Sequence, residues 1–338
     1  AAALAAPALS RSARAQGTQL AIATGTTGGV YYPLGGGLAN ILSRAIPGLS
    51  ATVEVTGGSV ANNQLLGAGR VGMIFTQVDA SVDAVRGVER FRGRPVNVRA
   101  LAVLYTNRMQ VVTTAAAGIG SMADLKGKRI STGAPGSATE LMALRLIEGA
   151  GLDPANDFRA RERLSPAEST NAIKDGKLDA YFFVSGVPTS AITDLGASPG
   201  ITLRLVDHAE FVPKIVEKHG PVYFPEVIPA GTYPGQTTDN KQMSVANILA
   251  VLDTMPNEQV TQILEVAWKG RDELAQVQDV LAADVRGDDG IDQRGAQRGE
   301  LPVGVAVQAR RHRGDRRRGA RRGPEPGRPR ARLARLLR

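Results

Sequence analysis

Short apolar runs rich in β-branched residues alternate with longer amphipathic segments from Thr18 to about Val285. The apolar runs predict strands over residues 20–24, 51–55, 72–76, 100–104, 110–114, 129–132, 180–184 and 202–206. The amphipathic segments predict helices over residues 34–45, 60–68, 138–148, 166–175 and 244–252. Strands that alternate with helices are typical of an α/β fold with largely parallel sheets.

The length of the chain, 338 residues, exceeds what one core of ordinary size accommodates and therefore predicts two lobes. Residues 100–114 contain two apolar runs joined by a few polar residues, which fits either an extended crossing between lobes or a hairpin. Residues 221–235 contain four prolines, which favour a second, constrained crossing. Two crossings predict a hinge between a lobe of residues 17–106 with 230–285 and an inserted lobe of residues 107–229.

The two ends of the chain differ from this body. Residues 1–16 are rich in alanine and carry a small-x-small pattern, Ala13-Arg-Ala15, which predicts a signal-peptide remnant and an exported, periplasmic protein. The alternative is a disordered alanine-rich terminus. No other apolar run approaches the roughly 20 residues that span a bilayer, so we expect a soluble mature chain.

The positive charge of the chain is concentrated in residues 286–338, which hold 16 arginines against 6 acidic residues, a net charge of +10. The preceding residues hold 25 basic and 26 acidic groups, a net charge of −1. Such a low-complexity Arg/Gly/Pro tail cannot form a packed core. We interpret it as a shift of reading frame near residue 286, and the alternative is a tail that binds nucleic acid or anionic lipid.

The stretch GTTGGVYYPLGGG, residues 25–37, follows the first expected strand. Its glycines allow the backbone to turn through positive φ, and Pro33 suits the first turn of a helix. A helix start exposes unpaired N–H groups at the positive end of the dipole, which predicts a site for a small anion such as a carboxylate. The alternative is a tight turn with buried tyrosines, and neither the dinucleotide fingerprint nor the phosphate-loop pattern is matched.

Two further strand-to-helix junctions contain glycine turns. Ser59 follows a Gly-Gly pair and is expected to cap the next helix, either for the helix alone or also facing a ligand. Ser137 and Glu140 have the spacing of a capping box, which gives Glu140 a mainly structural role. The N–H and hydroxyl groups around Gly136, Ser137 and Thr139 stay available to an anionic ligand.

The ends of two expected strands add candidates. Strand ends border the ligand crevice in open α/β sheets, so we expect Gln77, Phe183 and Ser185 to line it. Phe182 and Phe183 point to opposite faces of their strand, so only one of them is expected to face the cleft.

Composition narrows the chemistry. The absence of cysteine excludes disulfides, thiolate nucleophiles and cysteine metal sites, and His208, His219 and His312 are too scattered for a metal site or a catalytic triad. No histidine, cysteine or paired carboxylate lies in the glycine-rich junctions to move a proton. We expect a binding protein with no metal and no cofactor, and not an enzyme. The alternatives are a clamshell-fold enzyme acting on a small metabolite and a nucleic-acid binder working through the basic tail.

Several motifs occur together, in order, over about residues 18–280. They are TGTTGGVYYPLG at 24–35, TGGSVAN at 56–62, DLKGKRI at 124–130, GAPGSATE at 133–140, DGKLDAYFFVSG at 175–186 and IPAGTYPG at 228–235. Together they resemble the TAXI solute-binding proteins of TRAP (tripartite ATP-independent periplasmic) transporters. Members of that family usually end in a histidine- and proline-containing segment and a terminal helix bearing tyrosine, which do not follow Val285 here.

The resemblance implies an α/β, two-lobed clamshell like the type II periplasmic binding proteins, with a mixed, mostly parallel sheet flanked by helices in each lobe. It implies a monomer that binds a small carboxylate, either glutamate- or glutamine-like or a dicarboxylate such as 2-oxoglutarate. The implied partners are TRAP membrane permease subunits, and no nucleic acid. Carried over to this sequence, the site comprises Thr27, Gly28, Gly29, Tyr32, Ser59, Gln77, Gly136, Ser137, Thr139 and Phe183.

Overall fold

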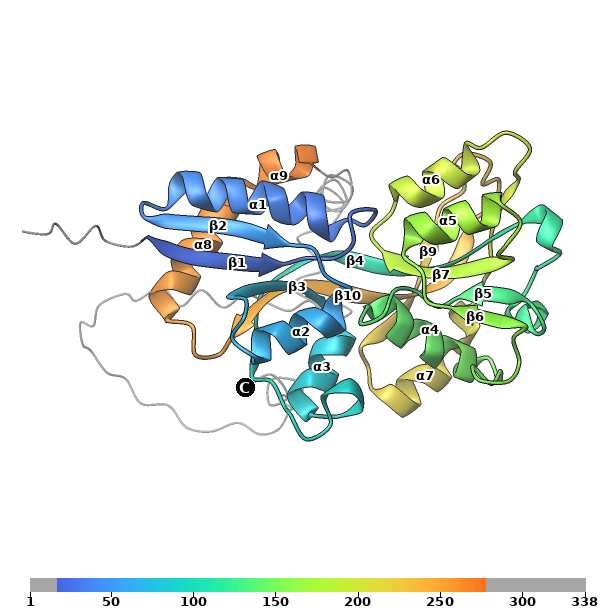
Figure 1. The fold of residues 1–338 in the computed structure, drawn as a ribbon, viewed down its shortest axis with the longest axis horizontal. Helices are drawn as coiled ribbons and strands as arrows, with labels where there is room; N and C mark the ends of the chain where they lie inside the picture. The colour runs from blue at the N-terminus through green and yellow to red at the C-terminus, as the bar shows by residue number, and fades with distance from the viewer. Residues whose placement is uncertain (1–16, 278–338) are drawn as a thin grey trace, which may run out of the picture. The chain divides into compact units, whose positions relative to one another are not determined.

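The computed structural model describes residues 17–277. The expected signal-peptide remnant, residues 1–16, and the basic tail, residues 286–338, lie outside the described residues. Within the described part the strands form one sheet in the order β2-β1-β3-β10-β4-β7-β5-β6, with β8 paired to β4 and β9 paired to β10. Helices cover both faces of this sheet (Figure 1).

The bounds of the elements follow. The strands are β1 (Thr18–Ala23), β2 (Leu49–Glu54), β3 (Met73–Gln77), β4 (Val98–Thr114), β5 (Arg129–Ser131), β6 (Ala160–Glu162), β7 (Ala180–Ser185), β8 (Leu203–Leu205), β9 (Tyr223–Ile228) and β10 (Asn240–Leu252). The α-helices are α1 (Tyr31–Ala45), α2 (Ser59–Gly67), α3 (Val78–Arg86), α4 (Ala138–Gly149), α5 (Pro166–Lys174), α6 (Ser190–Gly196), α7 (Val212–His219), α8 (Asn257–Lys269) and α9 (Arg271–Val277). Short 3₁₀ turns are η1 (Glu89–Phe91), η2 (Ala115–Ala117), η3 (Met122–Leu125) and η4 (Ala209–Phe211).

The first half of the fold consists of the parallel neighbours β1, β2 and β3 with helices α1, α2, α3, α8 and α9. α1 packs on β2 and against α8 and α9, whereas α2 and α3 lie on the other side of the sheet (Figure 1). Leu34, Leu38 and Leu42 recur every four residues along α1 and form one apolar stripe. This stripe packs against Ile22 and Phe75 in a single core cluster.

The second half consists of β5 to β9 with helices α4 to α7, and β5 is parallel to both β6 and β7. Met142 of α4 and Ile215 of α7 belong to one core cluster, and Ile173 of α5 and Ile192 of α6 belong to another. Because successive side chains of a strand point to opposite faces, the two neighbouring phenylalanines of β7 enter different clusters, as the alternation predicts.

Two long strands, β4 and β10, run antiparallel through both halves. The first part of β10 pairs with β9, and its later residues, Asn247 to Ala250, pair with β3. β4 pairs with β10 and then with β7 of the second half. Residues 100–114 are therefore one continuous crossing strand and not a hairpin. The fold is a mixed α/β fold with parallel strands on both flanks and antiparallel strands in the centre.

Two expectations from the sequence are corrected here. Residues 244–252 were predicted to be helical, but they form part of β10. The run is buried at Val245, Leu249 and Val251. A short central strand is buried on both faces, so the spacing of its apolar residues does not distinguish it from a buried helix. Residues 221–235 do not form the return crossing, because Ile228 and Tyr233 pack in the core of the second half. The chain returns within β10 instead.

Within residues 17–277, no helix has both the length and the apolar character needed to span a membrane.

Candidate functional site

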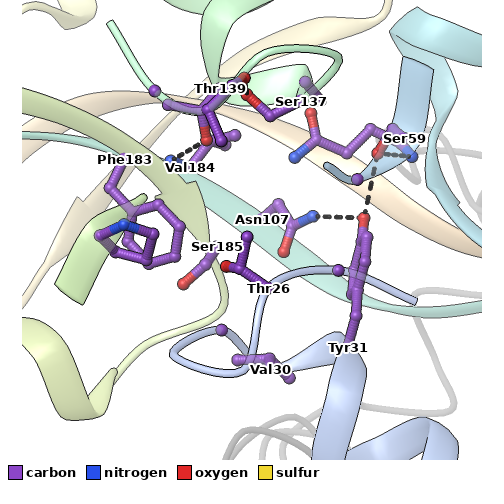
Figure 2. A pocket seen from close by; sticks show the side chains of 18 of the residues that line it. Thr26, Val30, Tyr31, Ser59, Asn107, Ser137, Thr139, Phe183, Val184 and Ser185 are labelled. Atoms are coloured by element: carbon purple, nitrogen blue, oxygen red, sulfur yellow. Dashed lines mark hydrogen bonds between the residues drawn. The ribbon is translucent and has the colours of Figure 1, made fainter. Parts of the chain in front are cut away.

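Three helices begin at one place between the two halves. α1 and α2 follow β1 and β2 in the first half, and α4 follows β5 in the second half. Their first residues, with the ends of β3 and β7, surround a cavity of about 60 Å³ (Figure 2). The lining includes Gly29, Tyr31, Ser59, Gln77, Asn107, Ser137, Thr139, Phe183 and Ser185. Helix starts therefore face the cavity from both halves.

A hydrogen-bonded chain forms the wall on the side of the first half. Asn107 Nδ2 donates to Tyr31 Oη at 3.2 Å, and Tyr31 Oη lies 3.4 Å from Ser59 Oγ. Ser59 Oγ also accepts the backbone N–H of Gln77 at 3.1 Å. The Tyr31 ring packs on Phe75, with 5.5 Å between ring centroids. Burial raises the pKa of Tyr31 above its ordinary value, so the hydroxyl stays protonated at neutral pH.

The role of Ser59 differs from the expected helix cap. The N-cap of α2 is Gly58, whose φ of 118° suits glycine, and no side chain caps this helix. Ser59 is the first helical residue, is 1% exposed, and directs its hydroxyl to Gln77 and Tyr31. Its side chain therefore joins α2 to the end of β3 at the cavity wall.

Hydroxyls of α4 order the opposite wall. Ser137 is the N-cap of α4, where Oγ accepts the Glu140 N–H at 3.0 Å and donates to the Ala134 carbonyl at 2.6 Å. Thr139 Oγ1 accepts the Val184 N–H at 3.2 Å and so ties α4 to β7. Because Ser137 Oγ both donates and accepts within the second half, the donors left for the cavity are the hydroxyl proton of Thr139 and the unpaired N–H groups in the first turn of α4.

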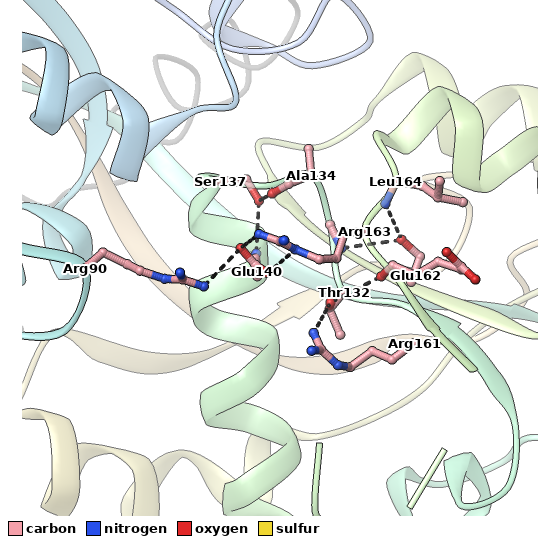
Figure 3. Close-up of polar contacts among 11 residues, drawn as sticks. Arg90, Thr132, Ala134, Ser137, Glu140, Arg161, Glu162, Arg163 and Leu164 are labelled. Atoms are coloured by element: carbon pink, nitrogen blue, oxygen red, sulfur yellow. Dashed lines mark hydrogen bonds and ion pairs between the residues drawn. The ribbon is translucent and has the colours of Figure 1, made fainter. Parts of the chain in front are cut away.

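Glu140 does not complete the expected capping box. The Ser137 N–H, which the Glu140 carboxylate was expected to accept, donates to the Ala134 carbonyl instead. The carboxylate accepts from Arg163 Nε at 2.6 Å and lies 3.9 Å from Arg90 Nη2 of the first half (Figure 3). Glu140 is thus held in a charged cluster beside the cavity and is not part of its lining.

The structure brings together some of the predicted site residues. Those that line the cavity are Gly29, Ser59, Gln77, Ser137, Thr139 and Phe183. Thr27 and Tyr32 are exposed, and neither of them lines the cavity. Gly28 and Gly136 are contact points between the halves, because a Cβ at Gly28 would lie 3.6 Å from Pro166 and one at Gly136 would lie 3.3 Å from Ala61.

Of the Tyr-Tyr pair, Tyr31 lines the cavity and the predicted Tyr32 does not. Adjacent residues of a helix point about 100° apart, so one of the pair faces the cavity wall and the other faces outward. Tyr31 lies three and seven residues before Leu34 and Leu38, which places it on the buried stripe of α1. This helical spacing was the available signal for Tyr31.

Asn107 was also missed as a site residue. It lies in the middle of β4 at the crossing between the halves and is 1% exposed. The available signal was the short polar stretch Thr106 to Arg108 between the two apolar runs of the crossing strand. Phe182 and Phe183 both border the cavity, although only one of them was expected to do so.

The cavity offers hydrogen-bond donors and acceptors but no charge, since none of its described lining side chains is charged at neutral pH. Gln77 is 2% exposed and Asn107 is 1% exposed. Gln77 Oε1 and Asn107 Oδ1 have no hydrogen-bond partner among the described residues. Buried amide oxygens are normally satisfied, so each is an acceptor for an N–H or O–H donor. Among residues 17–277, no cluster of three potential ligands could hold a metal ion.

The two halves touch around the cavity. The Ala61 N–H donates to the Gly136 carbonyl at 3.0 Å, which joins α2 to the loop before α4. Gly57 lies so close to Pro135 that a Cβ would be 2.2 Å from its carbonyl oxygen. These contacts border the space between the helix starts.

Solved structures with a similar fold come from several bacteria. A protein from Bordetella bronchiseptica RB50 matches with a TM-score of 0.51 and 18% identity, over 78% of this chain and 76% of that one. A Listeria monocytogenes protein assigned to L-cystine ABC transport matches with a TM-score of 0.49 and 16% identity, over 79% and 97%. The alkanesulfonate-binding protein SsuA from Xanthomonas axonopodis pv. citri, bound to MOPS, matches with a TM-score of 0.45 and 18% identity, over 80% and 76%.

The first of these likenesses supports the mixed α/β fold described above. A family model for the NMT1-like family matches residues 22–293, which is most of the chain. The chain belongs to the NMT1-like family.

Proposed function

We propose that the protein is a solute-binding protein that works in the periplasm and captures a small amino-bearing carboxylate between its two halves. It then delivers this solute to the membrane permease of a TRAP-type secondary transporter. The observation that carries the proposal is the cavity between the halves, where three helix starts meet and no described lining side chain is charged.

The helix starts favour an anionic ligand. Each helix carries roughly half a positive elementary charge at its N-terminus, together with N–H groups that have no partner inside the helix. α1, α2 and α4 have 15, 9 and 12 residues, long enough for aligned peptide dipoles. Three such ends that point at one small space stabilise a carboxylate without an arginine or lysine.

The unpartnered amide oxygens favour a ligand that also carries donors. Gln77 Oε1 and Asn107 Oδ1 are buried acceptors, and a carboxylate alone would leave both unsatisfied. An ammonium or amide group beside the carboxylate would donate to them. This complementarity favours a glutamate- or glutamine-like solute over a dicarboxylate such as 2-oxoglutarate.

The size of the cavity favours a small solute. Its volume of about 60 Å³ is far below the roughly 300 Å³ at which pockets for drug-sized ligands begin. The solute must therefore be small if the contacts between the halves are to stay in place around it. The apolar side of the space, formed by Phe183, Val184 and Leu164, would contact the aliphatic part of the solute.

We infer that capture works by closure of the two halves about β4 and β10. These are the two strands that run through both halves, and Asn107 lies on one of them. A solute shifts the open and closed forms only by its preference for one of them. A ligand bound to both halves, at Ser59 and Thr139 for example, prefers the closed form.

Export and the permease partner rest on the sequence motifs that resemble TAXI proteins, together with the alanine-rich start of the chain. From the same resemblance we propose that the protein is a monomer and has no nucleic-acid partner.

The proposal is tested by thermal melting of the full chain with L-glutamate, L-glutamine, 2-oxoglutarate and succinate. Glutamate and 2-oxoglutarate form a matched pair that differs in the amino and keto groups on one carbon. A solute present at 100 times its Kd stabilises the native state by about 2.7 kcal/mol, which raises Tm by about 5 °C or more for a chain of this size. We expect saturable stabilisation by an amino-bearing solute, and unchanged solute after incubation.

Three outcomes would contradict the proposal in whole or in part. If neither these solutes nor other small carboxylates stabilise the chain, the proposed capture of a carboxylate is wrong. If the solute is converted into a product, the protein is an enzyme and not a binding protein. Equal stabilisation by glutamate and 2-oxoglutarate would keep the carboxylate but reject the role given to the amide oxygens.

A further inference from the structure

A buried charged cluster joins the two halves at a second place, apart from the cavity. It consists of Asp79 and Asp83 of α3 in the first half, and Arg145 of α4 and Tyr223 of β9 in the second half. Arg145 Nη2 donates to Asp83 Oδ2 at 2.6 Å, and Arg145 Nη1 donates to Tyr223 Oη at 2.7 Å. Tyr223 Oη in turn donates to Asp79 Oδ2 at 2.9 Å. Two of these three bonds cross between the halves.

Water is almost absent from this cluster. The exposed fractions are 1% for Asp79, 7% for Asp83, 6% for Arg145 and 4% for Tyr223. One guanidinium therefore faces two carboxyl groups in a space with little solvent screening. Removal of one partner from such a cluster leaves an uncompensated buried charge, which costs far more than the loss of a surface ion pair.

Titration of the two carboxyl groups reflects this burial. Desolvation raises the pKa of Asp83 to about 6 against the opposing pull of Arg145, with smaller contributions from Asp79 and Glu89. Desolvation also raises the pKa of Asp79, which Arg145 and Tyr223 oppose. Burial therefore disfavours the charged form of both carboxyl groups, and the guanidinium of Arg145 is the nearby cation that opposes this.

The cluster is also connected to the cavity wall through the chain itself. Gln77, which lines the cavity, is the N-cap position of α3, and Asp79 lies two residues later in the first turn of that helix. The cluster therefore holds the start of α3 against the second half.

We propose that Asp79, Asp83, Arg145 and Tyr223 form a latch that holds the two halves closed, and that opening of the cavity requires this latch to separate. The proposal rests on the hinge motion inferred above. It assigns to Arg145 and Tyr223 a positioning role, because neither lines the cavity.

The test measures the separation of the halves directly. The chain has no cysteine, so Asn40→Cys on α1 and Asn171→Cys on α5 introduce two unique exposed sites for spin labels, one in each half. Distance distributions are recorded without solute and with L-glutamate. They are compared for the otherwise unchanged chain, Arg145→Met, Tyr223→Phe and the control Arg129→Met, which removes an ion pair to Asp179 inside the second half.

We expect Arg145→Met to shift the closed-to-open ratio towards open by about a hundredfold, since it leaves two buried carboxyl groups without their cation. Tyr223→Phe removes one hydroxyl without changing shape, and we expect a shift of about fivefold. Arg129→Met should leave the distance unchanged. Dissociation of bound solute, measured by stopped flow, should accelerate in the same order as the opening.

The results that would contradict the latch differ from the results that would contradict solute capture. If Arg145→Met does not fold, as judged by circular dichroism and melting, Tyr223→Phe decides the question. Folded Tyr223→Phe with the parental distance distribution and dissociation rate would overturn the latch. A parental chain that does not respond to any carboxylate would contradict the proposed function, while the comparison without solute would still test the latch.

Discussion

Replacement of Gly57 by alanine should keep the halves from closing fully. A Cβ at this position would lie 2.2 Å from the Pro135 carbonyl oxygen of the opposite half, whereas real Cβ atoms essentially never approach closer than 3.0 Å. The backbone of Gly57 is not left-handed, so alanine itself causes no local strain. The perturbation therefore acts on the contact between the halves and not on the fold of either half.

The size of the effect follows from the same geometry. Relief of the clash requires a separation of at least 0.8 Å, from 2.2 to 3.0 Å. The neighbouring bond from the Ala61 N–H to the Gly136 carbonyl is 3.0 Å long, so the same separation would stretch it to about 3.8 Å, beyond hydrogen-bond range. Loss of this bond costs about 1 kcal/mol in the closed form, and with the lost packing the affinity for solute should fall about tenfold.

Titration calorimetry with the most stabilising carboxylate of the melting screen measures this change. Gly36→Ala is the matched control, because a Cβ there meets nothing within 4 Å and lies inside α1. The control should bind like the parent and gain up to about 1 kcal/mol of stability from helix propensity. A Gly57→Ala chain with parental affinity would refute the reasoning that this contact belongs to the solute-bound form.

Further predictions concern single side chains. Tyr31→Phe removes the acceptor of the Asn107 bond and should weaken solute binding about fivefold by calorimetry, whereas Tyr32→Phe, on the exposed neighbour, should bind normally. Ser137→Ala removes the cap of α4 and should cost about 1 kcal/mol, which lowers Tm by about 2 °C without solute. An unchanged Tm would contradict the cap. His208 is fully buried, and desolvation lowers its pKa from 6.5 to about 4, so the unfolded chain takes up its proton first as pH falls. The native state should lose about 2 kcal/mol through this residue between pH 8 and pH 5, measured by urea unfolding, and His208→Asn should remove that part of the pH dependence; equal slopes for both chains would contradict it.

Local patterns predicted much of the fold. The strands that became β1, β2, β3, β5, β7 and β8, and the helices α1, α2, α4 and α5, follow from apolar periodicity and from glycine and serine at the junctions. These signals depend on a few neighbouring residues, since a turn through positive φ or a helix cap is a local requirement. The expected clustering of helix starts from both halves agrees with the cavity that the structure shows.

Contacts between distant residues decided the parts that the sequence did not predict. Residues 244–252 became a strand because β3, β4 and β9 lie on either side of them. The Pro-rich segment around Tyr233 belongs to the second half because its hydroxyl donates to Gln110 of β4, more than one hundred residues earlier in the chain. No window of neighbouring residues contains this information.

The sequence by itself determined the alternation of strands and helices and the glycine-opened helix starts, because both are set by backbone preferences within one or two turns of chain. Only the tertiary structure decided that Asn107 and Gln77 meet at the cavity and that Arg145 joins the two halves. The physical reason is that packing decides which partners come close enough to satisfy a hydrogen bond or a buried charge. The partners of Arg145, for example, are Asp83 and Tyr223, which lie 62 and 78 residues away from it in the sequence.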